Sequence, residues 1–280
     1  MIDYHLHSER SGDASGTIMD TCARAVEVGL TEICFTEHLD FEPTDDCYGA
    51  FDYDLYTRQI DEARDAFGGR LVVRRGIEVD YQEKHRSSIE DYLARAEFDY
   101  IVGSAHYVDG IILEDHGSYF PGKSARQAYE PYFENVIATI QTGWFDCVAH
   151  LDLCKRYGVR YFGSFACEPY WEWIDGALKT AIGMGMSIEI NTSGLRQSPR
   201  DTYPCREILE RYHALGGRSI TVGSDSHRVE DVGAGIAEAL EIARSVGFEN
   251  ATTFAGRTPS QISIATARTG SEPTTDGSNR

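Results

Sequence analysis

The sequence predicts one α/β domain, a distorted TIM-like (βα)7 barrel with a metal site at the C-terminal ends of its strands. Short β-rich runs alternate with helical stretches from the first residue to about residue 245, as expected for parallel βαβ units. Residues of metal-ligand type stand at the ends of six of the seven runs. A length of 280 residues suits a barrel of this kind as a single domain.

The expected strands are the seven β-rich runs at residues 2–6, 32–36, 71–78, 100–104, 146–149, 187–190 and 219–223. Helical segments are expected between and after them, near residues 17–28, 54–67, 87–96, 124–142, 169–183, 204–214 and 233–246. In the first of these, Ile18, Cys22 and Ala25 recur at helical spacing, and Thr17 is a suitable N-cap. We expect the barrel domain to span residues 1–268. The polar segment 269–280 (TGSEPTTDGSNR) is expected to be a disordered tail.

Composition narrows the classes of partner. The formal net charge is −19, from 45 acidic and 26 basic residues, which disfavours nucleic acid and anionic membranes as main partners. A small anionic substrate remains compatible, because metal ions and one or two arginines can invert the local potential. Seven cysteines without a C-x-x-C pair, no signal peptide and no apolar run of spanning length indicate a cytoplasmic protein with reduced thiols.

Nine residues of metal-ligand type lie in seven separated clusters, and they include six of the nine histidines. All but Asp13, which lies in a Ser/Gly-rich loop, stand at or just after the end of an expected strand. The nine are His5, His7, Asp13, His38, Glu78, His106, His150, Asp225 and His227. The C-terminal ends of barrel strands meet at one mouth, so we expect these side chains to form one site.

Single clusters have ordinary structural explanations. His38 alone is more often a polar loop residue, and Asp13 alone is a turn residue. Glu78 could pair with Arg74 or Arg75. Imidazole or carboxylate side chains stand at six of the seven strand ends. Their number favours a metal centre, because imidazole and carboxylate are ligands suited to zinc, iron and manganese.

The number of ligands favours more than one ion. A catalytic zinc usually takes three protein ligands and water, so nine candidates fit three divalent ions, with Glu78 able to bridge two of them. Clustered divalent ions lower the pKa of a bridging water and neutralise charge on a transferring phosphoryl group. This pattern indicates phosphoester hydrolysis.

The motifs at the strand ends resemble the PHP (polymerase and histidinol phosphatase) family of metal-dependent phosphoesterases. They are D-Y-H-L-H (3–7), T-E-H (36–38), G-I-E (76–78), G-S-A-H (103–106), A-H-L-D (149–152) and G-S-D-S-H (223–227). The resemblance runs from His5 to about Gly233 and implies a distorted barrel of seven βα units. Two further stretches, 150–157 (HLDLCKRY) and 189–196 (EINTSGLR) followed by Tyr203-Pro204, are similar to the family's monofunctional histidinol-phosphate phosphatases.

The resemblance implies three ions and a ligand set for each. The first set is His5, His7, Glu78 and Asp225, the second is Glu78, His106 and His150, and the third is Asp13, His38 and His227. Many members have a histidine where this chain has Asp13. The metal is expected to be zinc, iron, manganese or a mixture.

The resemblance also implies that Arg156 and Arg196 contact the substrate phosphate, which their guanidinium fork complements. The implied reaction is hydrolysis of L-histidinol phosphate to L-histidinol and phosphate, a step of histidine biosynthesis. A metal-bridging hydroxide would attack phosphorus, and Asp13, Asp225 or a metal-bound water could donate a proton to the leaving alkoxide.

Other readings of the chain stay open. One is a PHP phosphoesterase that acts on another small phosphomonoester, and a less favoured one is a PHP exonuclease. An exonuclease is expected to have a basic groove with aromatic side chains on which bases stack. This chain has no Lys/Arg-rich stretch, which disfavours that function. A catalytically inactive structural metal domain is disfavoured by the complete ligand set. The sequence does not indicate the oligomeric state.

Overall fold

The computed structural model describes residues 1–265 and contains a seven-stranded parallel sheet in the order β1-β2-β3-β4-β7-β8-β9. The strands are Ile2–Leu6 (β1), Glu32–Leu39 (β2), Val72–Asp80 (β3), Tyr100–Ser104 (β4), Cys147–Val148 (β7), Ser187–Asn191 (β8) and Ile220–Gly223 (β9). Five of the seven, β1, β4, β7, β8 and β9, are buried along their whole length, as expected when helices cover a parallel sheet.

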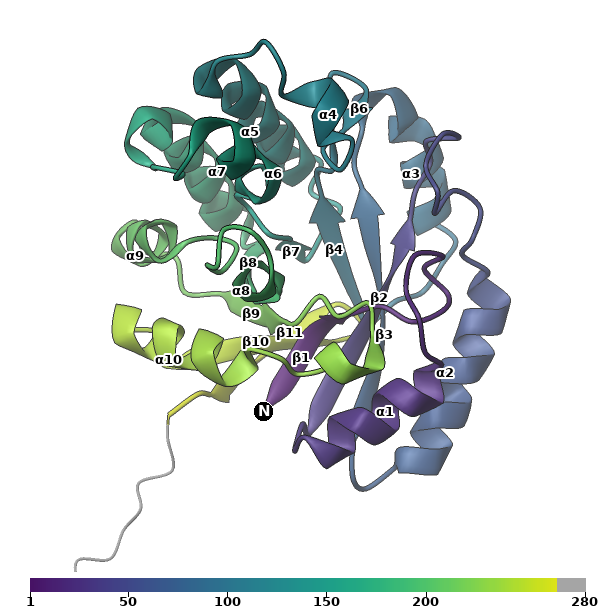
Figure 1. The fold of residues 1–280 in the computed structure, drawn as a ribbon. Helices are drawn as coiled ribbons and strands as arrows, with labels where there is room; N and C mark the ends of the chain where they lie inside the picture. Colours follow the sequence, from purple (N-terminus) through teal and green to yellow (C-terminus); the bar gives the residue numbers. More distant parts are fainter. Residues whose placement is uncertain (266–280) are drawn as a thin grey trace, which may run out of the picture.

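Helices surround the strands (Figure 1). The α-helices are Ile18–Glu27 (α1), Tyr53–Phe67 (α2), Arg86–Leu93 (α3), His116–Tyr119 (α4), Ala125–Gln141 (α5), Lys155–Phe162 (α6), Trp171–Met184 (α7), Ser193–Arg196 (α8), Arg206–Ala214 (α9) and Ile236–Val246 (α10). Three 3-10 turns span Glu83–His85 (η1), Glu168–Tyr170 (η2) and Val229–Asp231 (η3). No helix within residues 1–265 is long and apolar enough to cross a membrane.

Local chemistry explains where several helices begin and end. Thr17 and Asp20 form a capping box at the start of α1, and Ser124 and Gln127 form another at α5. The side chain of Asp52 caps α2 by accepting from the Leu55 amide. Gly185 adopts a left-handed conformation after α7, which ends that helix.

The sheet curls so that its last strand lies beside its first. The residues that follow β9 pair in parallel with the end of β1, through a bridge between Leu6 and Ser226. The His7 amide donates to the Ser226 carbonyl at 2.9 Å, and the Asp225 amide donates to the His5 carbonyl at 2.8 Å. The predicted barrel of seven βα units is thereby confirmed as a nearly closed barrel.

A hairpin that the sequence did not predict lies against the opposite end of the barrel. Its strands, Asn250–Ala255 (β10) and Thr258–Ser263 (β11), form a separate two-stranded sheet. Phe254 packs against Tyr4 and Tyr100, at ring-centroid distances of 6.5 and 5.0 Å. Arg257, in the turn, pairs with Asp146 at the start of β7. The hairpin therefore covers the end of the barrel away from the strand C-termini.

The other differences from the predicted elements are local. The long connection after β4 contains the small hairpin Tyr107–Val108 (β5) and Ile111–Ile112 (β6) and the single-turn helix α4. Helices α6 and α8, which follow β7 and β8, were also not predicted. Strand β7 has only two residues, and β2 and β3 continue past the predicted ends to Leu39 and Asp80. The predicted tail, residues 269–280, lies outside the described residues.

Candidate metal centre and active site

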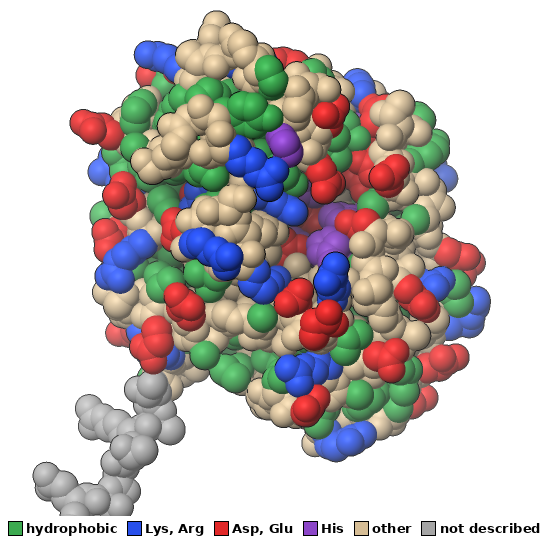
Figure 2. Space-filling model, in the orientation of Figure 1, with side chains coloured by type: hydrophobic (Ala, Val, Ile, Leu, Met, Phe, Trp, Pro, Cys, Tyr) green, Lys and Arg blue, Asp and Glu red, His purple; other side chains and the backbone are tan. Residues whose placement is uncertain are grey.

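A pocket of about 1220 Å³ opens at the C-terminal ends of the barrel strands. It is lined by seven of the nine predicted ligands and by both predicted phosphate-binding arginines, Arg156 and Arg196. His5 and His7, which are not among the lining residues, lie buried within hydrogen-bond reach of those that are. Figure 2 shows histidine side chains in a hollow that both basic and acidic side chains border. All nine predicted ligands thus meet at one site.

The strands and the loops that follow them carry these side chains. His5 lies in β1, and His7 is the first residue beyond it. Glu78 lies within β3, as predicted, and His38 lies within β2 rather than after it. The two residues are paired in the parallel register. His150 and Asp225 lie in loops and have positive φ angles of 23° and 51°. L-residues rarely adopt these angles, and such strain is concentrated at functional sites.

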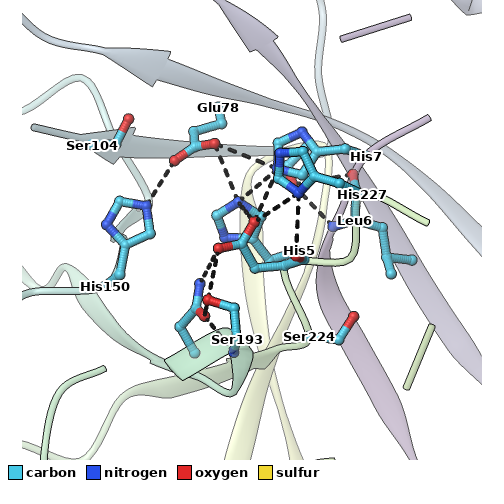
Figure 3. Close-up of polar contacts among 12 residues, drawn as sticks. His5, Leu6, His7, Glu78, Ser104, His150, Ser193, Ser224 and His227 are labelled. Carbon is cyan, nitrogen blue, oxygen red and sulfur yellow. Dashed lines mark hydrogen bonds and ion pairs between the residues drawn. The ribbon is translucent and has the colours of Figure 1, made fainter. Parts of the chain in front are cut away.

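Glu78 lies at the centre of the cluster and is fully buried. Its Oε2 atom is 3.2 Å from His5 Nε2 and 3.1 Å from His38 Nδ1. Its Oε1 atom faces the other side, 3.0 Å from His150 Nε2 and 3.5 Å from His106 Nε2. Figure 3 shows Glu78 between His150 on one side and His5 and His7 on the other. The carboxylate therefore has the geometry of a bridging ligand.

Two further groups of ligand atoms lie beside Glu78. His7 Nε2 is 3.1 Å from His5 Nε2 and 3.5 Å from Asp225 Oδ1. Toward the pocket mouth, Asp13 Oδ2 is 3.1 Å from His227 Nε2 and 3.6 Å from His38 Nε2. His7, His38 and His227 each offer a ring nitrogen within 4.8 Å of the others. Such spacings leave room for cations between the donors.

The dense packing of ligand-type side chains shifts the pKa values of the buried histidines. Burial lowers the pKa of His7 to about 3, and the neighbouring His227 and His38 act in the same direction. Burial also lowers the pKa of His106, to about 4, although Glu78 opposes this effect. Both rings are therefore neutral near pH 7, which is the form of imidazole that binds a metal.

The remaining charges balance each other inside the cluster. Burial would lower the pKa of His5, but Glu189, Glu78 and Asp225 raise it well above its usual value. Burial would likewise raise the pKa of Glu78, yet His5 and His38 hold it well below the usual range. A set of buried carboxylates that is neutralised by protons on histidines fits divalent cations, which displace such protons when they bind.

Buried acceptors behind the cluster fix the orientation of two histidines. Glu189 Oε1 is 2.7 Å from His5 Nδ1, so this nitrogen donates to Glu189 and Nε2 is the nitrogen that faces Glu78. Ser11 donates its hydroxyl hydrogen to Glu37 at 2.6 Å, so His7 Nδ1 must donate to Ser11 Oγ, at 2.9 Å. In both residues Nε2 is consequently the ring nitrogen that faces the other ligand-type side chains and would bind a cation.

Sequence reasoning assigned no role to these supporting residues. Glu189 is the third residue of β8, the one strand of the seven without a predicted ligand. Its Oε2 atom also accepts from the His150 amide at 2.9 Å and from Asn191 Nδ2 at 3.1 Å. The available signal was an acidic residue inside an apolar strand, because such a charge is rarely buried without partners.

The two predicted arginines line the same pocket but differ in their contacts. Arg156, in α6, stacks over the Tyr157 ring at 4.9 Å and has no ion pair among residues 1–265. Arg196, in α8, donates to the Ser224 carbonyl at 2.7 Å and lies 3.6 Å from Asp231. Arg228, which the sequence reasoning did not select, also lines the pocket. The pocket therefore offers several guanidinium groups to an anion.

The two candidate proton donors occupy different positions. Asp225 Oδ2 lies within hydrogen-bond distance of Asn191 Nδ2 (3.2 Å) and the Ser193 hydroxyl (3.1 Å), both of which donate to it. Asp13 is 38% exposed at the pocket mouth, and the described residues next to its carboxylate are His38 and His227. Both carboxylates are thus held as acceptors, and Asp13 is the more exposed of the two.

Known proteins are similar to this chain in sequence and architecture. Residues 3–193 match the PHP domain. A probable histidinol-phosphatase of Deinococcus radiodurans is 29% identical over 90% of this chain and 96% of its own length. A histidinol-phosphatase of Lactococcus lactis is 27% identical over 91% of this chain and 94% of its own length.

A solved structure gives the same relationship in three dimensions. Histidinol phosphate phosphatase from Lactococcus lactis, in complex with zinc, L-histidinol and phosphate, superposes with a TM-score of 0.84 at 25% identity. The match covers 92% of this chain and 98% of that protein. Because the PHP profile covers more than half of the sequence and the fold agrees, the chain belongs to the PHP domain family.

Proposed function

We propose that this protein hydrolyses L-histidinol phosphate to L-histidinol and phosphate, as a step of histidine biosynthesis. The observation that carries the proposal is the Lactococcus lactis structure, which has the same fold along nearly its whole length and holds zinc and both products of this reaction. In this chain the nine ligand-type residues and the two pocket arginines lie at the C-terminal ends of the strands of that shared fold.

The ligand cluster would hold three divalent cations. His5, His7, Glu78 and Asp225 would hold the first, and Glu78, His106 and His150 the second. Asp13, His38 and His227 would hold the third. The division is supported by the two faces of Glu78 and by the short distances within each set. Zinc is favoured by the imidazole-rich donors and by the Lactococcus lactis structure.

Each part of the pocket has a task in this reaction. Bound cations lower the pKa of a coordinated water and neutralise charge on the phosphoryl group. Arg156 and Arg196 would bind the non-bridging phosphate oxygens and stabilise the charge that spreads over them during transfer. The leaving alkoxide needs a proton. Asp13 is the more exposed of the two candidate donors, but His227 and His38 hold its pKa well below the usual range, as His5 and His7 do for Asp225.

The charge of the protein separates this function from its alternatives. A net charge of −19 and the acids around the pocket oppose binding of single-stranded nucleic acid, which tracks positively charged grooves. Another small phosphomonoester is the closer alternative, since the arginines and the ligand cluster recognise only the phosphate.

A substrate panel tests the proposal. Phosphate release from L-histidinol phosphate is compared with release from other small phosphomonoesters, and nucleotide release from single-stranded DNA is followed in parallel. We expect kcat/KM for L-histidinol phosphate to exceed that for every other compound by about 100-fold or more, as substrate-specific contacts allow. Equal or greater efficiency on another phosphomonoester or on DNA would refute the assignment.

A further inference from the structure

Asp40 is a buried acid to which the proposed reaction assigns no role. It follows β2 directly, two residues after His38, and its side chain lines the pocket. The residue is only 8% exposed, yet its carboxylate has no hydrogen bond or ion pair with any residue between 1 and 265. The Asp40 oxygens are not among the unpartnered side-chain atoms that are sealed from solvent, so a ligand in the pocket can reach them.

The neighbours of Asp40 are acids as well, but their oxygens are already engaged. Asp45 accepts from the Cys47 amide at 2.8 Å and from the Tyr107 hydroxyl at 2.7 Å. Asp80 accepts from the His106 amide at 2.6 Å and from Gln82 at 2.9 Å. No lysine or arginine among the described residues pairs with any of these three aspartates. Of these three acids, Asp40 is therefore the one whose oxygens have no hydrogen-bond partner among the described residues.

The pocket has opposite charge on its other side. Arg156, Arg196 and Arg228 come from the loops after β7, β8 and β9, whereas Asp40 and Asp45 follow β2. In the closed strand order β7 and β8 are the strands farthest from β2, so Arg156 and Arg196 lie across the barrel from Asp40 and Asp45, whereas Arg228 follows β9, two strands from β2. A molecule with a phosphate at one end and a cation at the other matches this arrangement of charges.

We propose that Asp40 binds the ammonium group of the substrate and so selects cationic phosphomonoesters. The inference rests on the proposed function, because the arginines and the ligand cluster must hold the phosphate at the other end. L-Histidinol phosphate carries an ammonium group that is charged at neutral pH. An ion pair in a pocket shielded from water favours the charged partner over a neutral analogue.

A fourth metal ion at Asp40, Asp45 and Cys47 fits less well, although these residues offer ligand atoms within 4.8 Å of one another. Both oxygens of Asp45 already accept hydrogen bonds. An organic cation needs only the free oxygens of Asp40 and the open pocket in front of them.

The test compares two substrates in two enzymes, each reconstituted with zinc. The substrates are L-histidinol phosphate and 3-(imidazol-4-yl)propyl phosphate, which lacks only the amine. The wild-type enzyme should prefer the first by about tenfold or more in kcat/KM, and Asp40→Asn should abolish that preference. Asp54→Asn, an equal charge change on the exposed face of α2, should keep it.

A wild-type enzyme with no preference for the amine, or an Asp40→Asn enzyme that retains it, would overturn the inference. Zinc content and thermal unfolding verify that Asp40→Asn is folded and loaded. Tyr107→Phe, which frees one oxygen of Asp45, provides a second variant and should reduce the preference less. A fourth zinc bound by the wild type and lost in Asp40→Asn would also overturn it in favour of a metal site.

Calorimetry separates this inference from the proposed function. L-Histidinol is titrated into the zinc-loaded protein in the presence of inorganic phosphate. If the wild type binds L-histidinol about tenfold or more tightly than Asp40→Asn but does not hydrolyse the phosphate ester, the cation site stands and the proposed reaction fails. Equal binding by the two proteins would contradict the cation site alone.

Discussion

Glu78 links the groups of ligand-type side chains because its two oxygens face different histidines. Oε2 faces His5 and His38, and Oε1 faces His106 and His150. Buried acceptors hold two of the surrounding imidazole rings in place. Glu189 accepts from His5, and Ser11, which donates to Glu37, accepts from His7. Some residues of the site therefore face the pocket, and others lie behind them and fix the orientation of their side chains.

Glu189→Gln should weaken metal binding without unfolding the protein. The amide group of glutamine would place a donor against groups that already donate to Glu189, namely His5, Asn191 or the His150 amide. We expect zinc affinity to fall by about 10- to 100-fold, as for other residues that orient metal ligands. Competition with a chromophoric chelator measures this affinity, and Glu172→Gln on the exposed face of α7 is the matched control. Unchanged affinity in Glu189→Gln would show that it does not orient His5.

The two arginines should respond differently to removal. Arg156→Ala should lower kcat/KM about 100-fold by loss of a charge-assisted phosphate contact, with little change in stability, since Arg156 has no ion pair among the described residues. Arg196→Ala should lower both activity and melting temperature, because it also removes the bond to the Ser224 carbonyl. Steady-state kinetics and thermal unfolding measure these effects.

Arg160→Ala, on the same helix but paired with His116 outside the pocket, is the control for Arg156. Its kcat/KM should remain near that of the wild type. If Arg156→Ala kept full activity, the arginine would have no part in phosphate binding.

At the scale of elements, the barrel separates stability from function. The strand C-termini and the loops that follow them carry the ligand cluster and the arginines, whereas the β10–β11 hairpin covers the opposite end. Phe254 is 4% exposed and packs on Tyr4 and Tyr100 far from the pocket. The hairpin should therefore contribute to folding but not to the reaction.

Phe254→Ala should reduce the free energy of unfolding by about 3 kcal/mol, through lost burial and the cavity left behind. Phe254→Leu should cost less than about 1.5 kcal/mol, because leucine fills part of the space. Urea unfolding measures both values, and kcat of the folded enzyme should not change. A large loss of kcat in folded Phe254→Ala would contradict the separation.

The elements that the sequence predicts are those with strong periodicity. The seven strands and the longer helices fall within a few residues of the expected positions, and the strand ends reveal the ligands before any contact is known. Helices α4, α6 and α8 have eight residues or fewer, and β5 and β6 have two each, so they are too short to produce a pattern. Strand β11 is almost wholly exposed, which removes the apolar alternation that marks a strand.

The supporting residues of the site could not be predicted for a different reason. Glu189, Glu37 and Asp40 are ordinary acids in the sequence, and only the fold brings them next to a ligand or the pocket. The sequence also did not predict that His38 lies inside its strand, because β2 extends beyond its apolar part. Contacts between residues far apart in the sequence determine where these residues lie and where the strands end, so local sequence patterns do not predict either.

At the scale of the whole molecule, a strongly acidic protein encloses a pocket that is arranged for an anion. The net charge of −19 repels polyanions, while arginines on one side of the pocket and a cluster that fits divalent cations create a local site for phosphate. The central claim is that the cluster of nine ligands holds the cations on which phosphomonoester hydrolysis depends.

The most direct test is phosphate release from L-histidinol phosphate before and after removal of metal, with the metal content measured in the same samples. The account predicts that the protein stripped by a chelator has lost at least about 99% of its activity, as expected when metal ions supply several kcal/mol of transition-state stabilisation. Activity should return as zinc is restored, up to three ions per chain. Full activity in protein free of metal would contradict the account.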